Sequence, residues 1–151
     1  MEIKSDTIQK TQKIAHDLAK TLKGGDIVAL FGDLGVGKTT FVQGLAVGLG
    51  IKKRILSPTF VFIRSYPLTI NHKPASPAKR GEPLTFYHID LYRGEGINDF
   101  QDLGLDELFG NDAIVVLEWA DKIKNKLPKK RIDVTIETVD ETTRRIKIQR
   151  R

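Results

Sequence analysis

The chain has 151 residues, of which 40% are hydrophobic and 29% charged, and its formal net charge is +6. These values are typical of one globular domain with a single core, and they exclude a disordered chain. Cysteine is absent, which excludes disulfide bonds and thiolate metal sites and predicts a reducing compartment.

Apolar stretches are too short to span a membrane. The longest have five residues, at 27–31 and 113–117, and the first 13 residues are polar with charges of both signs. A transmembrane helix needs about 20 apolar residues, and a signal peptide needs an apolar stretch of about 7–15. We therefore expect a cytoplasmic protein that contacts no membrane.

An amphipathic helix is the first predicted element. Apolar residues recur at helical spacing from Ile8 to Leu22. Ser5 and Asp6 precede this pattern as candidate N-caps, and a pair of glycines at 24–25 ends it.

A strand, a turn and a second helix follow. The continuous apolar run 27–31 predicts a strand buried on both faces, as in the centre of a parallel sheet. A glycine-rich turn then leads into a predicted helix over 38–49. The remaining predicted elements are strands near 59–66, 84–89 and 113–117, a short helix around 99–109, and a terminal hairpin of 132–138 and 144–149. Residues 67–83 carry four prolines without periodicity and predict an exposed, mobile loop.

The glycine-rich turn matches the phosphate-binding pattern G-x-x-x-x-G-K-[ST] at every fixed position, from Gly32 to Thr39. Glycines let backbone N–H groups approach phosphate oxygens, and the helix that follows adds the positive end of its dipole. We therefore predict a single P-loop ATPase domain over 1–151. Its expected fold is α/β and P-loop NTPase-like, with three layers, a mixed, largely parallel sheet flanked by helices, and a C-terminal β-hairpin.

Nine consecutive residues form the predicted nucleotide-binding set. They are Gly32, Asp33, Leu34, Gly35, Val36, Gly37, Lys38, Thr39 and Thr40. Lys38 is expected to reach the β and γ phosphates, and the Thr39 hydroxyl to ligate Mg²⁺. Thr40 is placed to donate to the α phosphate.

Magnesium needs a further acidic group, normally at the end of a neighbouring strand. Glu118 follows the apolar run 113–117 and Asp90 follows the strand 84–89, so both are candidates. The nucleotide is expected to be ATP rather than GTP, because the sequence lacks the guanine-reading pattern Asn-Lys-x-Asp.

Basic residues concentrate late in the chain, at 122–131 and at 144–151. Such a surface attracts phosphate backbones, and it also keeps a small protein soluble. Both interpretations remain open.

Three further motifs follow the phosphate loop. They are Ser57-Pro58-Thr59-Phe60, Tyr87-His88-Ile89-Asp90-Leu91-Tyr92-Arg93 and Leu117-Glu118-Trp119. With these motifs the chain resembles the bacterial TsaE (YjeE) ATPases of tRNA threonylcarbamoyladenosine biosynthesis, from the first helix to about Asp121. Beyond Asp121 no motif of this family is recognised.

The resemblance implies a Mg²⁺-dependent ATPase that acts with the TsaD and TsaB subunits. The ATPase is expected to be slow when isolated, because no residue of the sequence is clearly an arginine finger. It implies that Glu118 belongs to the magnesium site, that Thr59 lies in a switch-like loop facing the γ phosphate, and that Asp90 supports the metal and water network. Lys38, Glu118, Asp90 and Thr59 are thus the expected catalytic residues, with Thr39 and Glu118 as metal ligands. Contact with tRNA is expected to be indirect or to use the basic C-terminal region.

Two other functions stay open. One is a small-molecule kinase, for which 67–83 with Arg80 would be the lid, and the other is a non-catalytic binding module controlled by nucleotide. His88 is interpreted as a half-buried structural residue, Trp119 as a packing residue near the nucleotide, and Arg93 as an exposed arginine at a strand end.

Overall fold

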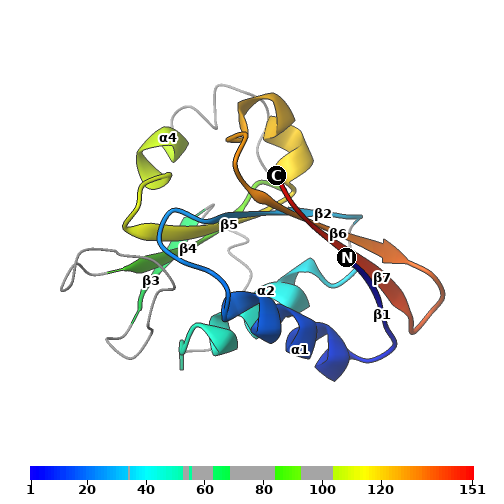
Figure 1. The fold of residues 1–151 in the computed structure, drawn as a ribbon. Coiled ribbons are helices and arrows are strands. Elements are labelled where there is room, and N and C mark those ends of the chain that lie inside the picture. The colour runs from blue at the N-terminus through cyan, green and yellow to red at the C-terminus, as the bar shows by residue number, and fades with distance from the viewer. Residues whose placement is uncertain (34, 53–54, 56–62, 69–83, 93–103) are drawn as a thin grey trace.

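One seven-stranded sheet with helices on both of its faces forms the fold (Figure 1). The computed structural model describes residues 1–33, 35–52, 55, 63–68, 84–92 and 104–151. Its elements, in chain order, are β1 (Glu2–Ser5), α1 (Ile8–Ala19), β2 (Ile27–Phe31), α2 (Lys38–Gly48), β3 (Ile63–Pro67), β4 (Thr85–Asp90), α4 (Leu105–Leu108), β5 (Ala113–Glu118), the 3-10 helix η1 (Ala120–Lys126), β6 (Ile132–Thr138) and β7 (Arg144–Arg150).

The strands lie in the order β1-β7-β6-β2-β5-β4-β3. The four central strands, β6, β2, β5 and β4, run parallel, and the pairings outside them are antiparallel. The predicted α/β class, mixed sheet and C-terminal hairpin are therefore confirmed, with the parallel part confined to the centre. The carboxyl ends of β2, β4 and β5 consequently meet at one edge of the sheet.

β2 is apolar at every position because both of its faces are covered. Val28 and Leu30 pack in the core that α1 and α2 close, whereas Ile27 and Ala29 pack in the core on the opposite face, together with η1. All four side chains are buried. The continuous apolar run thus predicts this strand correctly.

Small residues let α1 and α2 lie close together on one face of the sheet. A Cβ added at Gly44 would lie 2.7 Å from the Cα of Gln12 and 2.9 Å from the Cβ of Ala15, and one added at Gly48 would lie 2.6 Å from the Cβ of Ala19. The packing against α1 holds α2 in place, and with it the first turn of α2 at the edge of the sheet.

The N-terminal segment differs from the sequence prediction in two respects. Ser5 ends strand β1, which was not predicted, and its Oγ shares a 2.7 Å hydrogen bond with the Thr11 hydroxyl. The N-cap of α1 is Thr7, whose hydroxyl accepts from the Lys10 N–H at 3.0 Å. Ser5 and Asp6 are therefore not the cap, because α1 starts later than the candidate caps required.

Other predicted elements agree in type and differ at their ends. β3 covers the later part of the strand predicted near 59–66, and α4 covers part of the helix predicted around 99–109; residues 56–62 and 93–103 lie outside the described residues. Of the predicted loop 67–83, Pro67 ends β3 and 69–83 lie outside the description as well. The short helix η1 was not predicted. No helix in the described part of the chain is long and apolar enough to cross a membrane.

Replacing Gly44 by alanine tests the helix contact. The Gly44→Ala change gains up to about 1 kcal/mol of helix propensity, but the added methyl meets the backbone of α1 at Gln12. We expect the steric overlap with Gln12 to outweigh the gain in helix propensity, so that the free energy of unfolding falls by about 2 kcal/mol. Val47→Ala, at a position of α2 that is 64% exposed, is the control and should change stability by less than about 0.5 kcal/mol. Urea unfolding measures both; a stabilised Gly44→Ala protein would contradict the close packing.

Candidate functional site

The loop between β2 and α2 has the form that phosphate binding requires. Gly35 and Gly37 have φ of +80° and +106°, in the left-handed region that favours glycine. Gly37 is the N-cap of α2, and no described side chain caps that end of the helix. The N–H groups of the first turn are therefore available to an anionic ligand, with the positive end of the helix dipole behind them.

Lys38 is folded back over this loop. Only 5% of the residue is exposed, and its Nζ donates to the carbonyl oxygens of Gly32 and, at 2.9 Å, of Asp33. The same Nζ lies 3.8 Å from the ring centroid of Trp119. Burial lowers the pKa of the Lys38 amino group, and the carboxylate of Glu118 opposes this shift. The loop thus surrounds a buried amino group, which carries the positive charge and has the side-chain length needed to contact a phosphate.

Three polar side chains lie on one face of two neighbouring strands. Asp90 and Glu118 are direct partners in the register of β4 with β5, and His88 precedes Asp90 by two residues. Because side chains alternate along a strand, all three project to the face that carries α2. The same face is apolar earlier in both strands, where Phe86 and Val116 belong to the core under α1 and α2.

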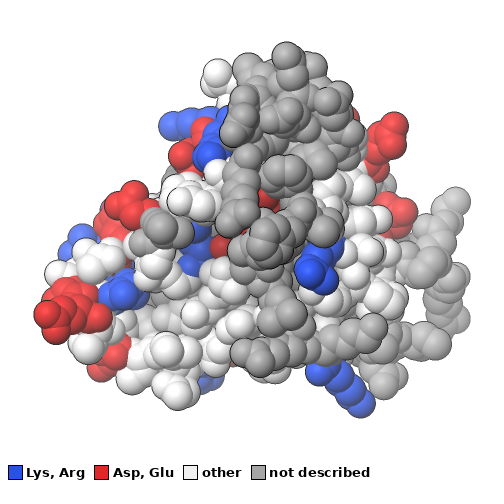
Figure 2. Space-filling view, turned by 180° about the vertical axis from the view of Figure 1, so that it is seen from behind, with Lys and Arg blue, Asp and Glu red and all other residues white. Residues whose placement is uncertain are grey.

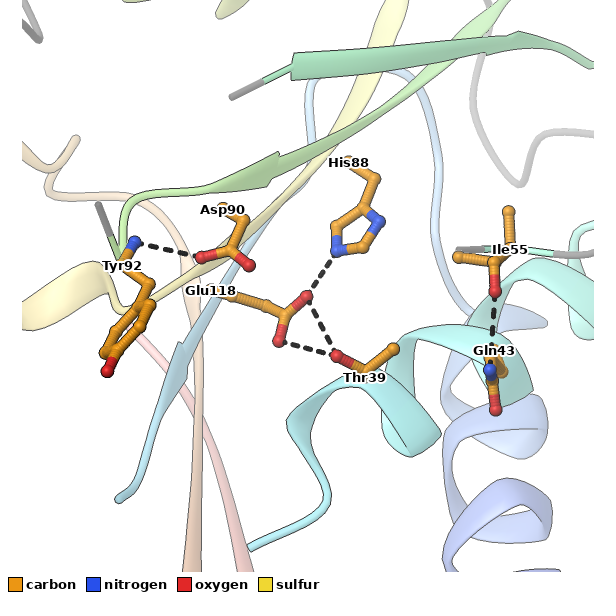
Figure 3. A network of polar contacts seen from close by, with 7 residues as sticks. All are labelled: Thr39, Gln43, Ile55, His88, Asp90, Tyr92 and Glu118. Carbon is orange, nitrogen blue, oxygen red and sulfur yellow. Dashed lines mark hydrogen bonds and ion pairs between the residues drawn. The ribbon is translucent and has the colours of Figure 1, made fainter. Parts of the chain in front are cut away.

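Glu118 is the centre of this polar group (Figure 3). The Thr39 hydroxyl, in the first turn of α2, donates to Glu118 Oε1 at 3.1 Å, and His88 Nε2 hydrogen-bonds to Glu118 Oε2. Asp90 Oδ1 accepts from the Tyr92 N–H at 2.9 Å. Figure 3 shows that these residues come from α2, β4 and β5 and converge where the strands end.

The structure brings together some of the residues that the sequence predicts for the site. Lys38, Thr39, Asp90 and Glu118 converge, whereas Leu34 and the whole motif 57–60, with Thr59, lie outside the described residues. Thr40 lies in the first turn of α2 and is half-buried.

The described residues do not form an all-protein metal cage. They contain no group of three or more histidines and carboxylates with the arrangement of a metal site. Mg²⁺ typically takes one or two protein oxygens and completes its shell with phosphate and water. The hydroxyl of Thr39 beside the carboxylate of Glu118 fits that kind of site.

Trp119 has a backbone conformation and a contact with Lys38 that the sequence does not predict. Its φ of 60° makes it the one non-glycine residue with positive φ among the described residues. This conformation is costly for a bulky side chain. It sets the ring under Lys38 and against Tyr92, with 5.0 Å between the ring centroids. Trp119 therefore contacts the lysine of the loop directly.

Arg144 of β7 supports the loop from the other side. Its Nε donates to the carbonyl oxygen of Val36 at 3.1 Å, and its Nη1 donates to the carbonyls of Asp140 and Thr143 at 3.0 and 3.2 Å. No local pattern in the sequence indicates this contact, because 108 positions separate Arg144 from Val36.

Comparison with known proteins identifies the family. The family profile described as "Threonylcarbamoyl adenosine biosynthesis protein TsaE" matches residues 5–146. The chain belongs to the TsaE family. The TsaE match extends through β6 into β7, so it includes the terminal hairpin, in which no family motif is recognised from the sequence.

Individual TsaE proteins agree over most of the chain. The tRNA threonylcarbamoyladenosine biosynthesis protein TsaE of Bacillus subtilis is 38% identical over 138 residues, which are 91% of this chain and 78% of the relative. The protein of the same name from Treponema pallidum is 32% identical over 148 residues, 98% and 99% of the two chains. The crystal structure of Bacillus subtilis YdiB superposes with a TM-score of 0.73 at 34% identity, covering 97% of this chain and 82% of that one. The family resemblance and the fold are thus confirmed, and the chain belongs to a family of tRNA threonylcarbamoyladenosine biosynthesis.

The Arg144 contact predicts a local effect on the loop. Arg144→Ala removes the donor to Val36, so backbone amides 35–38 should exchange with deuterium several-fold faster, and the free energy of unfolding should fall by about 1–2 kcal/mol. Arg145→Ala is the control, because Arg145 forms partly exposed pairs with Glu2 and Glu137 and has no hydrogen bond to the described residues of the loop. Equal exchange in the two variants would show that Arg144 does not hold the loop.

Proposed function

We propose that this TsaE-family protein binds and hydrolyses ATP with Mg²⁺, and that the ATPase serves tRNA threonylcarbamoyladenosine modification together with the TsaD and TsaB subunits. One observation carries the proposal. The buried Lys38 and the first turn of α2, with no described side chain capping it, lie beside a hydroxyl and a carboxylate 3.1 Å apart, Thr39 and Glu118. This combination of cationic loop and oxygen ligands suits a phosphate chain carrying a magnesium ion.

Each residue has a role that its position supports. Lys38 would offset the negative charge of the phosphates, and the N–H groups after Gly37 would donate hydrogen bonds to phosphate oxygens. Thr39 and Glu118 would hold Mg²⁺, and Asp90, the register partner of Glu118, would support them. A bound Mg²⁺ contributes by neutralising the charge that develops on the phosphates. For Thr59 the role opposite the γ phosphate rests on the family resemblance alone.

The basic cluster at 144–151 is a candidate for contact with tRNA. The side chains of the cluster at 144–151 are largely engaged within the protein: Arg145 and Lys147 pair with Glu137, Arg151 pairs with Asp133, and Arg144 holds the phosphate loop. Figure 2 shows basic and acidic side chains interspersed over the face that it presents. These contacts favour a structural role for that cluster. A cytoplasmic location fits a protein that serves tRNA modification.

The central test is loss of ATP hydrolysis in loop variants that keep the fold. Lys38→Met keeps most of the buried stem of Lys38 and removes the charge together with the donors to the carbonyls of Gly32 and Asp33, whereas Lys38→Ala removes the stem as well. We expect both, and Thr39→Ala, to lower ATP turnover at least about 100-fold. Lys129→Ala, at an exposed lysine outside the site, is the control and should match the wild type.

The acidic residues should separate binding from hydrolysis. Glu118→Gln keeps the side-chain shape and removes the charge, so at saturating Mg²⁺ we expect nucleotide binding to persist and most turnover to be lost. Asp90→Asn should have the milder effect. Circular dichroism and phosphate release measure fold and turnover. Unchanged turnover in Lys38→Met would contradict the proposed site, and a reversed ranking of the two acids would move the metal site to Asp90.

Partner dependence is the second test of the proposed function. Within the described residues, the arginine that hydrogen-bonds to the loop, Arg144, is engaged with three backbone carbonyls, so it does not act as an arginine finger. We expect slow turnover by the isolated protein and a rise of at least about tenfold, or about 1.4 kcal/mol of barrier, when TsaD and TsaB are added. The Thr39→Ala protein with the same subunits is the control for contaminating ATPases. Equal turnover with and without the subunits would favour a self-sufficient enzyme.

A further inference from the structure

His88 is a buried histidine in an otherwise apolar stretch of β4. The residue is 0% exposed, and its Nε2 hydrogen-bonds to Glu118 Oε2. Its Nδ1 is buried and has no hydrogen-bond partner among the described residues. The predicted role, a half-buried structural residue, explains neither the complete burial nor the contact with a carboxylate.

The hydrogen bond between His88 and Glu118 has one direction when the carboxylate is ionised. An ionised carboxylate only accepts hydrogen bonds, so Nε2 carries the hydrogen that this bond uses. Nε2 is therefore a donor aimed at one oxygen of Glu118.

This donor acts together with the hydroxyl of Thr39. Thr39 Oγ1 lies 3.1 Å from Glu118 Oε1 and 3.5 Å from Oε2, on the side of α2, while His88 approaches Oε2 from β4. A glutamate side chain has three rotatable bonds, and fixing it has an entropic cost. Two donors from different elements fix the carboxylate plane and leave Oε1 directed toward the start of α2 (Figure 3).

We propose that His88 is the positioning residue of Glu118: it donates from Nε2 to Oε2 and thereby holds the carboxylate in the orientation that serves a divalent cation beside Thr39. The role rests on the proposed function, because it assumes that nucleotide binds with Mg²⁺. His88 acts through Glu118 and does not itself contact the nucleotide or the metal. Partners that orient a metal ligand typically change metal affinity or activity 10–100-fold when they are removed.

Three variants distinguish this role from simple filling of the core. His88→Leu fills the space without a donor, and His88→Gln keeps an N–H at about the reach of Nε2. Phe86→Leu is the matched control, since Phe86 is also 0% exposed and lies on the same face of β4 two residues earlier. His88→Asn, whose amide is too short to reach Glu118 Oε2, replaces His88→Leu if that protein does not fold.

The measurement is the Mg²⁺ concentration that gives half-maximal binding of a fluorescent ATP analogue, followed by kcat and KM for ATP. For His88→Leu we expect the Mg²⁺ midpoint to rise about tenfold or more and kcat to fall by a similar factor, with KM at saturating Mg²⁺ within about threefold of the wild type. His88→Gln should stay within about threefold of the wild type in all three values. Phe86→Leu should lower the thermal midpoint of unfolding and leave the Mg²⁺ midpoint unchanged.

The outcomes separate this inference from the proposed function. A wild type whose binding of the analogue ignores Mg²⁺ overturns the proposed function and this role together. A Mg²⁺-dependent wild type with an unchanged midpoint in His88→Leu, or in the replacement His88→Asn, overturns the role of His88 alone. A His88→Gln protein as impaired as His88→Leu shows that the donor is not what matters, and overturns it as well. Recovery by His88→Gln, with an unaffected Phe86→Leu, supports it.

Discussion

A carboxylate removed from water needs hydrogen-bond donors, and Glu118, which is 3% exposed, obtains them from two elements. Thr39 donates from the first turn of α2 and His88 from the middle of β4. The arrangement therefore depends on the register of β4 with β5 and on the position of α2 against the sheet. A slip of one residue in β4 would turn His88 and Asp90 to the other face and leave the carboxylate partly unsatisfied.

Apolar packing maintains this register. Phe86 and Val116 are buried on the face that His88 and Glu118 share, whereas Ile89 and Leu117 are buried on the opposite face. Both faces of the central strands thus resist a slip, because either direction would place polar groups in a core. The site lies where this apolar pattern gives way to polar side chains, at the last residues of β4 and β5.

Much of the fold follows from local patterns in the sequence. The bounds of β2 were predicted from its apolar run, the start of α2 from the glycine-rich motif, and the meeting of Asp90 with Glu118 follows because parallel strands end at the same edge. What could not be predicted depends on distant partners. β1 is a strand because it pairs with β7, and its own four residues, Glu2–Ser5, carry little apolar signal. The left-handed backbone of Trp119 and the contact of Arg144 with the loop depend likewise on tertiary packing.

The order of strands has a consequence for synthesis of the protein on the ribosome. β1 pairs with β7 in a register that joins Ile3 to Ile146, and β2 lies between β5 and β6. A nascent chain that has just left the exit tunnel with β1, α1, β2 and α2 therefore has none of the neighbouring strands of this sheet. Until the later strands emerge, the backbone N–H and C=O groups of β2 lack their strand partners, and its apolar side chains are incompletely covered. Unpaired strands with exposed apolar side chains are prone to aggregate, and chaperones bind such segments of a nascent chain.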